Sequence, residues 1–133
     1  MRHQWKFSFH DAFDAEFDLL PEAVQDELLA TAKAVQRLGP DAGRPHVGTL
    51  HNPRHPNMKE LRFKVNNGAE IWRAAFAFGP DRHPVLLVAG SKQGKSEQQF
   101  YSDLLKLANK RFDEHLKSLQ AASAVLQNGM QSR

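Results

Sequence analysis

The sequence predicts an α+β domain with a mainly antiparallel sheet. Three observations favour this class. An Asn67-Gly68 pair separates two strand-like runs, 59–65 and 70–78, and this pattern is typical of a β-hairpin because both turn residues adopt positive φ. Apolar residues recur at helical spacing before and after these strands, within 21–38 and 100–119. Consecutive strands flanked by helices indicate an α+β fold.

The N-terminal part predicts one strand and one helix. Aromatic residues alternate with polar ones over residues 5–9, as in a short strand. Pro21 suits the first turn of a helix, and Gly39-Pro40 suits its end. Residues 40–57 are rich in proline and predict an ordered surface loop that leads into the sheet.

The central part predicts three consecutive antiparallel strands. If Asn67-Gly68 is a two-residue loop, Phe63 faces Trp72 and Arg62 faces Arg73. Residues 85–89 are apolar on both faces, which is typical of a central strand.

A long C-terminal helix is expected after Ser96, which begins a capping-box pattern. Its apolar spacing persists for about 20 residues, or about 30 Å. We therefore expect a β-α-βββ-α order, with the helices packed on one face of the sheet. Residues 1–120 are expected to form a single domain, and residues 121–133 a frayed tail.

Composition narrows the class of protein. The 133 residues include no cysteine, which excludes disulfides and thiolate metal sites and suits a reducing cytoplasm. No apolar run approaches the roughly 20 residues that span a bilayer. We expect a cytoplasmic protein without a membrane partner, a metal or a cofactor. The histidines at 46, 51 and 55 lack the fixed spacing of a metal site.

Positive charge is concentrated in the middle of the chain. Residues 1–40 carry four Lys/Arg and seven Asp/Glu, whereas residues 41–95 carry nine and four. A basic region on a small domain favours a polyanionic partner. The alternative is an ordinary basic surface.

The facing pair Arg62 and Arg73 is the most informative feature of the hairpin. Like charges directly opposite each other destabilise a sheet. An anion such as a phosphate between them would offset the repulsion. The alternative is two solvated arginines that point apart on an exposed face.

Several motifs occur in the order found in one family. Over residues 5–117 the chain resembles the HigB branch of the RelE/ParE toxin superfamily, including its phage-derived relatives, at residues 58–62 (MKELR), 71–78 (IWRAAFAF), 85–92 (VLLVAGSK), 100–101 (FY) and 113–116 (DEHL). The resemblance implies a RelE-like fold and a toxin of a type II toxin–antitoxin pair. It also implies cleavage of mRNA, bound in the ribosome, and a helix-turn-helix antitoxin as partner.

RNA cleavage by the neighbouring 2′-hydroxyl needs a base, an acid and cations that hold the phosphate. Arg62 and Arg73 suit the phosphate, because a guanidinium binds it through two hydrogen bonds. Lys92 matches the basic residue that the superfamily places at the end of this strand, as base or as phosphate clamp. Tyr101 could donate a proton or stack on a base, although the superfamily usually has this residue at a strand end. Each could instead be ordinary surface charge or a helix residue.

Further cations are expected to contact the RNA backbone, namely Lys59, Lys64, Lys95, His51 and His55. Such contacts give affinity without sequence information. Two other functions remain open: a non-enzymatic inhibitor of gyrase, as in ParE-type relatives, and an inactive module that binds nucleic acid or antitoxin.

Overall fold

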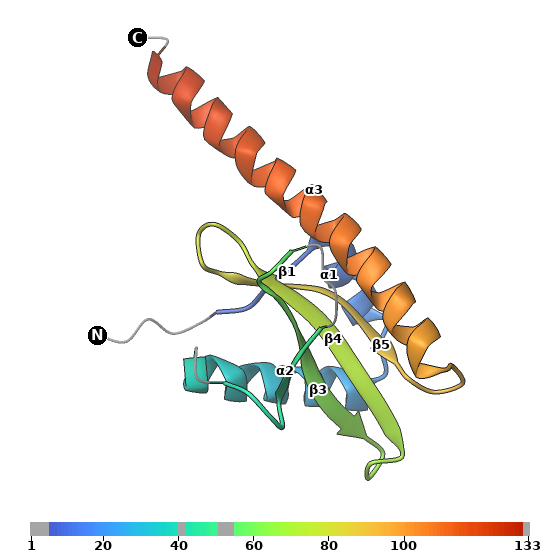
Figure 1. Cartoon of the computed structure of the whole chain (residues 1–133). Coiled ribbons are helices and arrows are strands. Elements are labelled where there is room, and N and C mark those ends of the chain that lie inside the picture. The colour runs from blue at the N-terminus through green and yellow to red at the C-terminus, as the bar shows by residue number, and fades with distance from the viewer. Residues whose placement is uncertain (1–5, 40–41, 51–54, 132–133) are drawn as a thin grey trace.

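The computed structural model describes residues 6–39, 42–50 and 55–131 (Figure 1). Its elements in chain order are β1 (Ser8–Phe9), α1 (Asp11–Asp18), α2 (Glu22–Leu38), β2 (Val47–Thr49), β3 (Met58–Val65), β4 (Glu70–Phe78), β5 (Pro84–Ser91) and α3 (Glu97–Gln131). The α+β class is confirmed. Two short elements, α1 and β2, were not expected.

The sheet has the order β1-β5-β4-β3-β2, in which only β1 and β5 run parallel. The hairpin has its predicted register, because Arg62 pairs with Arg73 and Phe63 with Trp72. Asn67 and Gly68 have φ of 55° and 88°. The amide of residue 69 donates to the carbonyl of residue 66 at 3.0 Å. These are the marks of a type I′ turn, so the turn sets the register of the arginines.

Helix α1 forms in a stretch where acidic residues obscure the apolar pattern. His10 caps it, because its Nδ1 accepts from the Ala12 amide at 3.1 Å. Phe13 and Phe17 lie four residues apart on one side of the helix and contact Phe9. Helix α1 thus adds aromatic side chains to the core.

Helices cover both faces of the sheet, so the expectation of a single covered face was wrong (Figure 1). Helices α1 and α2 pack on the face that carries Leu61, Phe63 and Phe76. Helix α3 packs on the other face, against Ala75 and Leu87. The reason is that β4 and β5 carry apolar residues at both odd and even positions, so each face needs a cover.

Helix α3 continues past residue 120 and projects beyond the sheet (Figure 1). It ends at Gln131, where a frayed tail over 121–133 was expected. The segment 121–126 is rich in alanine, which favours helix, and its side chains are exposed. Because they add nothing to the core, a domain that ends near residue 120 stays a prediction. Within the described ranges, no helix has the length and apolar character needed to cross a membrane.

Candidate functional site

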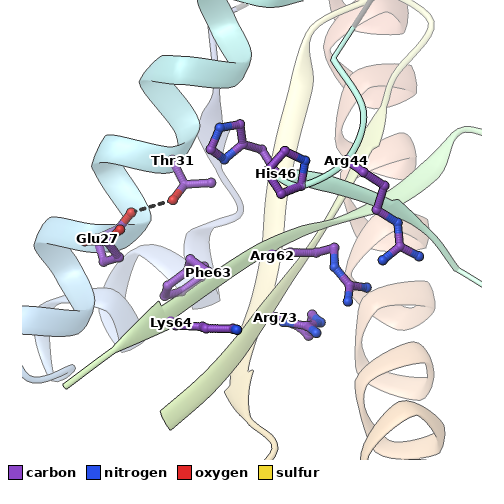
Figure 2. Close-up of a pocket in the computed structure, with 9 residues that line it drawn as sticks. Glu27, Thr31, Arg44, His46, Arg62, Phe63, Lys64 and Arg73 are labelled. Carbon is purple, nitrogen blue, oxygen red and sulfur yellow. Dashed lines mark hydrogen bonds between the residues drawn. The ribbon is translucent and has the colours of Figure 1, made fainter. Parts of the chain in front are cut away.

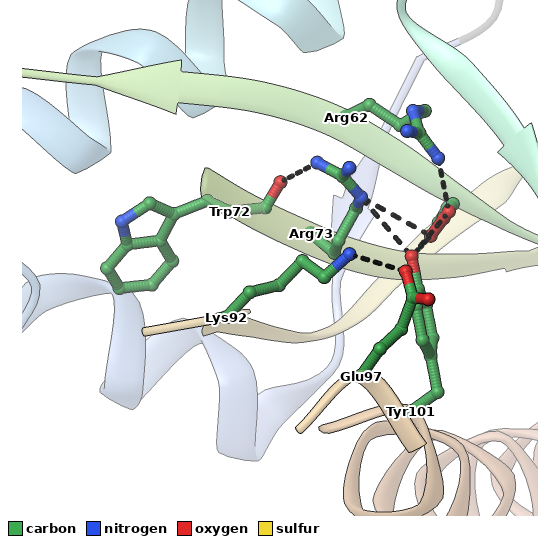
Figure 3. Close-up of polar contacts among 7 residues, drawn as sticks. Arg62, Trp72, Arg73, Lys92, Glu97 and Tyr101 are labelled. Atoms are coloured by element: carbon green, nitrogen blue, oxygen red, sulfur yellow. Dashed lines mark hydrogen bonds and ion pairs between the residues drawn. The ribbon is translucent and has the colours of Figure 1, made fainter. Parts of the chain in front are cut away.

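A buried carboxylate, Glu60 of β3, lies at the centre of a polar network formed with Arg62, Arg73 and Tyr101. Figure 3 labels these three partners, which come from β3, β4 and α3. The Glu60 side chain is 2% exposed. Arg62 Nη1 donates to its Oε1 at 3.0 Å, and Tyr101 Oη lies 3.0 and 2.9 Å from its two oxygens. Arg73 Nε lies 3.7 Å from Glu60 Oε2 and donates to Tyr101 Oη at 3.3 Å. We call these four residues the Glu60 network.

Sheet geometry brings the network together. Glu60 and Arg62 are two residues apart on β3, so they share a face, and Arg73 lies opposite Arg62 on β4. The residue opposite Glu60 is Ala75, which is small and leaves room for the carboxylate. A Cβ at Gly48 of β2 would lie 3.1 Å from both Arg62 Cδ and Glu60 Oε1. A glycine there lets this pair pack closely against β2.

The anion between the two arginines is therefore a side chain of the protein itself. Sequence analysis missed Glu60, although its place two residues before Arg62, opposite an alanine, was a usable signal. The alternative of two solvated arginines is also wrong. Arg73 is 5% exposed, and its Nη1 donates to the Trp72 carbonyl at 2.9 Å. Arg62 is less enclosed, with a side chain that is 24% exposed.

Lys92 and Tyr101 meet where the end of β5 approaches the first turn of α3 (Figure 3). Lys92 Nζ lies 5.2 Å from the centroid of the Tyr101 ring. It also forms an ion pair of 2.9 Å with Glu97 Oε1. A Cβ at Gly90 would lie 3.3 Å from the Phe100 ring, so glycine permits this close packing of α3 on β5. The structure thus brings together all four residues that were expected to be catalytic.

The environment perturbs two acidic groups of the site. Burial is the main cause that raises the pKa of Tyr101, and Glu60 adds to the rise while Arg73 opposes it. The phenol therefore keeps its proton at neutral pH and can donate it. The hydrogen bond from Lys92, followed by the charge of Lys92, lowers the pKa of Glu97. Glu97 is therefore an anion that neutralises Lys92.

Two cavities border the network. The first, of about 490 Å³, is called the site cavity and is lined by Arg44, Thr49, Glu60, Arg62, Glu97, Gln98, Tyr101 and Leu105. The second, of about 480 Å³, is called the α2 cavity and is lined by Glu27, Thr31, Arg44, Pro45, His46, Arg62, Phe63, Lys64 and Arg73 (Figure 2). Arg44 and Arg62 line both cavities. Arg44 was not among the expected site residues.

Among the described residues that were expected as further RNA contacts, only Lys64 lines one of these two cavities. Lys59 lies on the opposite face of β3 from Glu60. Lys95 pairs with Asp103 at 3.4 Å, and His55 contacts Asp113 at 2.9 Å, about 18 Å along α3 from Tyr101.

His51 lies outside the described residues. The roles of these residues in RNA binding stay predictions. In the described part of the chain, no group of three or more His, Asp or Glu side chains is arranged to hold a metal ion.

Comparison with known proteins places the chain in a family. The model of the family described as "Phage derived protein Gp49-like" matches residues 15–113. The chain belongs to the Gp49-like family. Two proteins of Mycobacterium tuberculosis (strain ATCC 25618 / H37Rv) are similar to it. The one named "Putative toxin HigB2" is 38% identical over 93 residues, and the one named "Putative toxin HigB3" is 34% identical over 97 residues.

These similarities cover 70% and 71% of the Gp49-like chain. The chain spans 45% of the length of HigB2 and 81% of that of HigB3. Among solved structures, that of a mutant of the E. coli toxin RelE in the free state is similar, with a TM-score of 0.52 and 12% identity. The similarity covers 77% of this chain and 95% of the RelE chain, so the Gp49-like chain has the RelE fold. The resemblance to HigB proteins is confirmed, and so is the expected RelE-like fold.

Proposed function

We propose that this Gp49-like protein is the toxin of a type II toxin–antitoxin pair and cleaves mRNA as a metal-independent endoribonuclease. The main support is the Glu60 network, in which Arg62 of β3 and the proton donor Tyr101 of α3 line the site cavity, while Arg73 of β4 lines the adjoining α2 cavity. Relatives that carry toxin names are 34% and 38% identical to the chain. The proposed substrate is the phosphodiester backbone of single-stranded RNA.

The cations of the site suit an RNA phosphate. Arg62 is part-exposed at the cavity wall and can turn from Glu60 to the phosphate, since a guanidinium binds either anion through the same planar donors. Arg73 is fixed by Trp72 and Tyr101 and presents a preoriented positive charge. Lys92 is paired with Glu97, so its role is a charged clamp and not a base. Glu97 releases it when the phosphate binds.

The proposed base is Glu60, and the proposed acid is Tyr101. Glu60 accepts the proton of the 2′-hydroxyl once Arg62 has turned to the substrate. The 2′-oxygen attacks phosphorus, and the bond from phosphorus to the 5′-oxygen breaks. Tyr101 gives its proton to the leaving 5′-oxygen, because its raised pKa keeps it protonated until that step. The 2.9 Å contact between Tyr101 Oη and Glu60 Oε2 then returns the proton from Glu60 to the phenolate. The products are a 2′,3′-cyclic phosphate and a 5′-hydroxyl.

The direct test is cleavage of mRNA by the purified chain, with and without ribosomes. We expect products that end in a 2′,3′-cyclic phosphate. Tyr101→Phe keeps the ring but removes the proton donor, so cleavage should fall by about 10²- to 10⁴-fold. The matched control is Lys110→Gln, on an exposed position of α3 that lines neither cavity. Cleavage only with ribosomes present would agree with substrate positioning by the ribosome.

Expression in bacteria distinguishes the proposed nuclease from the alternative, an inhibitor of gyrase. Induction without an antitoxin should stop protein synthesis first, with fragmented mRNA. An early stop of DNA synthesis while mRNA remains intact would refute the nuclease and favour the ParE-type alternative.

A small helix-turn-helix protein is proposed as the antitoxin. Its binding should abolish cleavage. The simplest way to inhibit the toxin is for an acidic or helical segment of the antitoxin to cover the basic cavities. Co-purification of the two chains at low salt tests this proposal. Two folded proteins that do not bind each other would contradict it.

A further inference from the structure

We propose that the α2 cavity is a second subsite, which binds the phosphate next to the one that is cleaved. The inference rests on the proposed function, because it names a further contact of the same RNA strand. The cavity lies between β3, α2 and the segment that precedes β2. Figure 2 shows arginine and lysine side chains at one side of it and Glu27 and Thr31 of α2 at the other.

The lining of the α2 cavity carries more positive than negative charge, with Arg44, Arg62, Lys64 and Arg73 against Glu27. Arg62 and Arg73, at its boundary with the network, already have Glu60 as counter-ion. Arg44 and Lys64 have none, because no ion pair joins either of them to a carboxylate in the described ranges. Both side chains are exposed at a concave surface, where uncompensated charge attracts an anion most strongly. The missing counter-ion is an anion from outside the chain.

The position of the cavity fits an RNA strand that leaves the site cavity. Arg44 and Arg62 line both cavities, so the two spaces adjoin along β3. The pairing of β2 with β3 ends at Leu61, and the last contact is a 2.8 Å hydrogen bond from the Arg62 amide to the His46 carbonyl. Beyond it the edge of β3 is uncovered by β2. A strand held by Arg62 can therefore continue along this edge to Arg44 and Lys64.

The lining favours a phosphate over a base. Stacking needs an exposed aromatic face. Phe63 of the lining is 5% exposed and His46 is half-buried, so neither ring offers a fully open face. Thr31 is also buried, and its hydroxyl donates to the Glu27 carbonyl at 2.8 Å, so it offers little to a base edge. The volume of about 480 Å³ lies within the usual range for ligand pockets, about 300–1,000 Å³. The subsite would add affinity without sequence preference.

The test is binding of a 2′-O-methyl RNA oligonucleotide of mixed sequence, which cannot be cleaved by its 2′-oxygen. Fluorescence anisotropy gives Kd between about 50 and 200 mM salt. Each lost phosphate contact should reduce the slope of log K against log salt by about 0.7. Arg44→Gln and Lys64→Gln should each weaken binding and reduce this slope. Glu27→Gln removes the negative charge from the lining and should tighten binding.

Lys110→Gln is the matched control, since it removes one positive charge from an exposed site outside both cavities and should leave the slope unchanged. An unchanged slope in Arg44→Gln and Lys64→Gln, with normal cleavage by the wild-type chain, would overturn the subsite and leave the proposed function standing. Wild-type protein that neither binds nor cleaves RNA would overturn both. Variants that bind RNA normally but lose affinity for the antitoxin would overturn the subsite in favour of an acidic protein segment.

Discussion

Two buried arginines, Arg73 and Arg111, each pair with a carboxylate, but the carboxylates differ in their exposure to solvent. Arg111 of α3 is 7% exposed. Its Nη1 donates to Glu16 Oε1 and to the Leu87 carbonyl, both at 2.8 Å. Its Nη2 pairs with Glu16 Oε2. It joins α3 to α1 and β5. Arg73 instead shares its buried carboxylate, Glu60, with Arg62 at the wall of two cavities.

The difference lies in which partner is buried. The side chain of Glu16 is 47% exposed, so a cation in the interior is held by an acid that water still reaches. The side chain of Glu60 is 2% exposed, so an acid in the interior gathers cations at a cavity. In the first arrangement the recorded hydrogen bonds of the arginine end on the protein and join three elements, so its role is structural. The second keeps positive charge at a cavity, where the proposed RNA phosphate would take over from the carboxylate.

The largest expected effect is that of Glu60→Gln. Glutamine keeps the shape but neither accepts the proton nor balances two guanidinium groups. We expect cleavage to fall by about 10²- to 10⁴-fold. The melting temperature should fall as well, because removal of one partner of a buried ion pair leaves charge uncompensated. A cleavage assay beside a melting curve measures both. A variant that melts lower but cleaves normally would make Glu60 structural, like Glu16.

Arg62→Met should separate activity from stability. Arg62 is more exposed than Arg73 and Glu60, and Glu60 keeps its contacts with Tyr101 and Arg73 without it. We expect a loss of about 3 kcal/mol of transition-state stabilisation, or about a hundredfold in rate. The change in melting temperature should be small. Full cleavage by a folded Arg62→Met variant would show that Arg62 is not part of the active site.

Arg111→Met should lower the stability of the protein and leave its activity unchanged. The buried Leu87 carbonyl loses a donor, and Glu16 returns to water, so the free energy of unfolding should fall by about 1–3 kcal/mol. The cleavage rate of the folded protein should not change. Denaturant unfolding measures the first quantity, and cleavage below the melting range measures the second. A loss of rate larger than the unfolded fraction would link Arg111 to the chemistry.

The smallest effect concerns pH. The hydrogen bond from Arg111 holds the pKa of Glu16 below its ordinary value, against the opposing effect of burial. A lowered native pKa gives stability that is complete above the unfolded pKa and is lost as pH falls through the native pKa. Because Glu16 is half-exposed, the contribution should stay below about 1 kcal/mol. Melting curves of wild type and Glu16→Gln should therefore converge between about pH 6 and pH 3. A gap that widens on acidification would contradict this assignment.

Local sequence rules predicted the hairpin and, with it, the site arginines. The turn chemistry of Asn67-Gly68 fixes the register over the length of β3 and β4, so the pairing of Arg62 with Arg73 followed from sequence alone. Family resemblance added Lys92 and Tyr101, which the packing of α3 on β5 brings to the same place.

The residues that were missed depend on contacts between distant parts of the chain. The burial of Glu60 depends on α3, whose Tyr101 lies 41 residues away in sequence. Arg44 precedes an edge strand too short to show in a hydrophobic pattern. The expectation of one covered face failed because α3 packs opposite α2. The apolar residues on both faces of 85–89 already indicated that each face needs a cover.

Helix α3 makes local unfolding a possible off state of this protein. The sheet alone carries Glu60, Arg62 and Arg73, whereas Tyr101 lies near the N-terminal end of the helix. If that end of α3 detaches while the sheet stays folded, the carboxylate loses the phenol and the site loses its proton donor. Elements open separately at a lower free energy than the whole domain. Hydrogen exchange of the amides near Tyr101, compared with those of β4, would report how often the protein exists without its proposed acid.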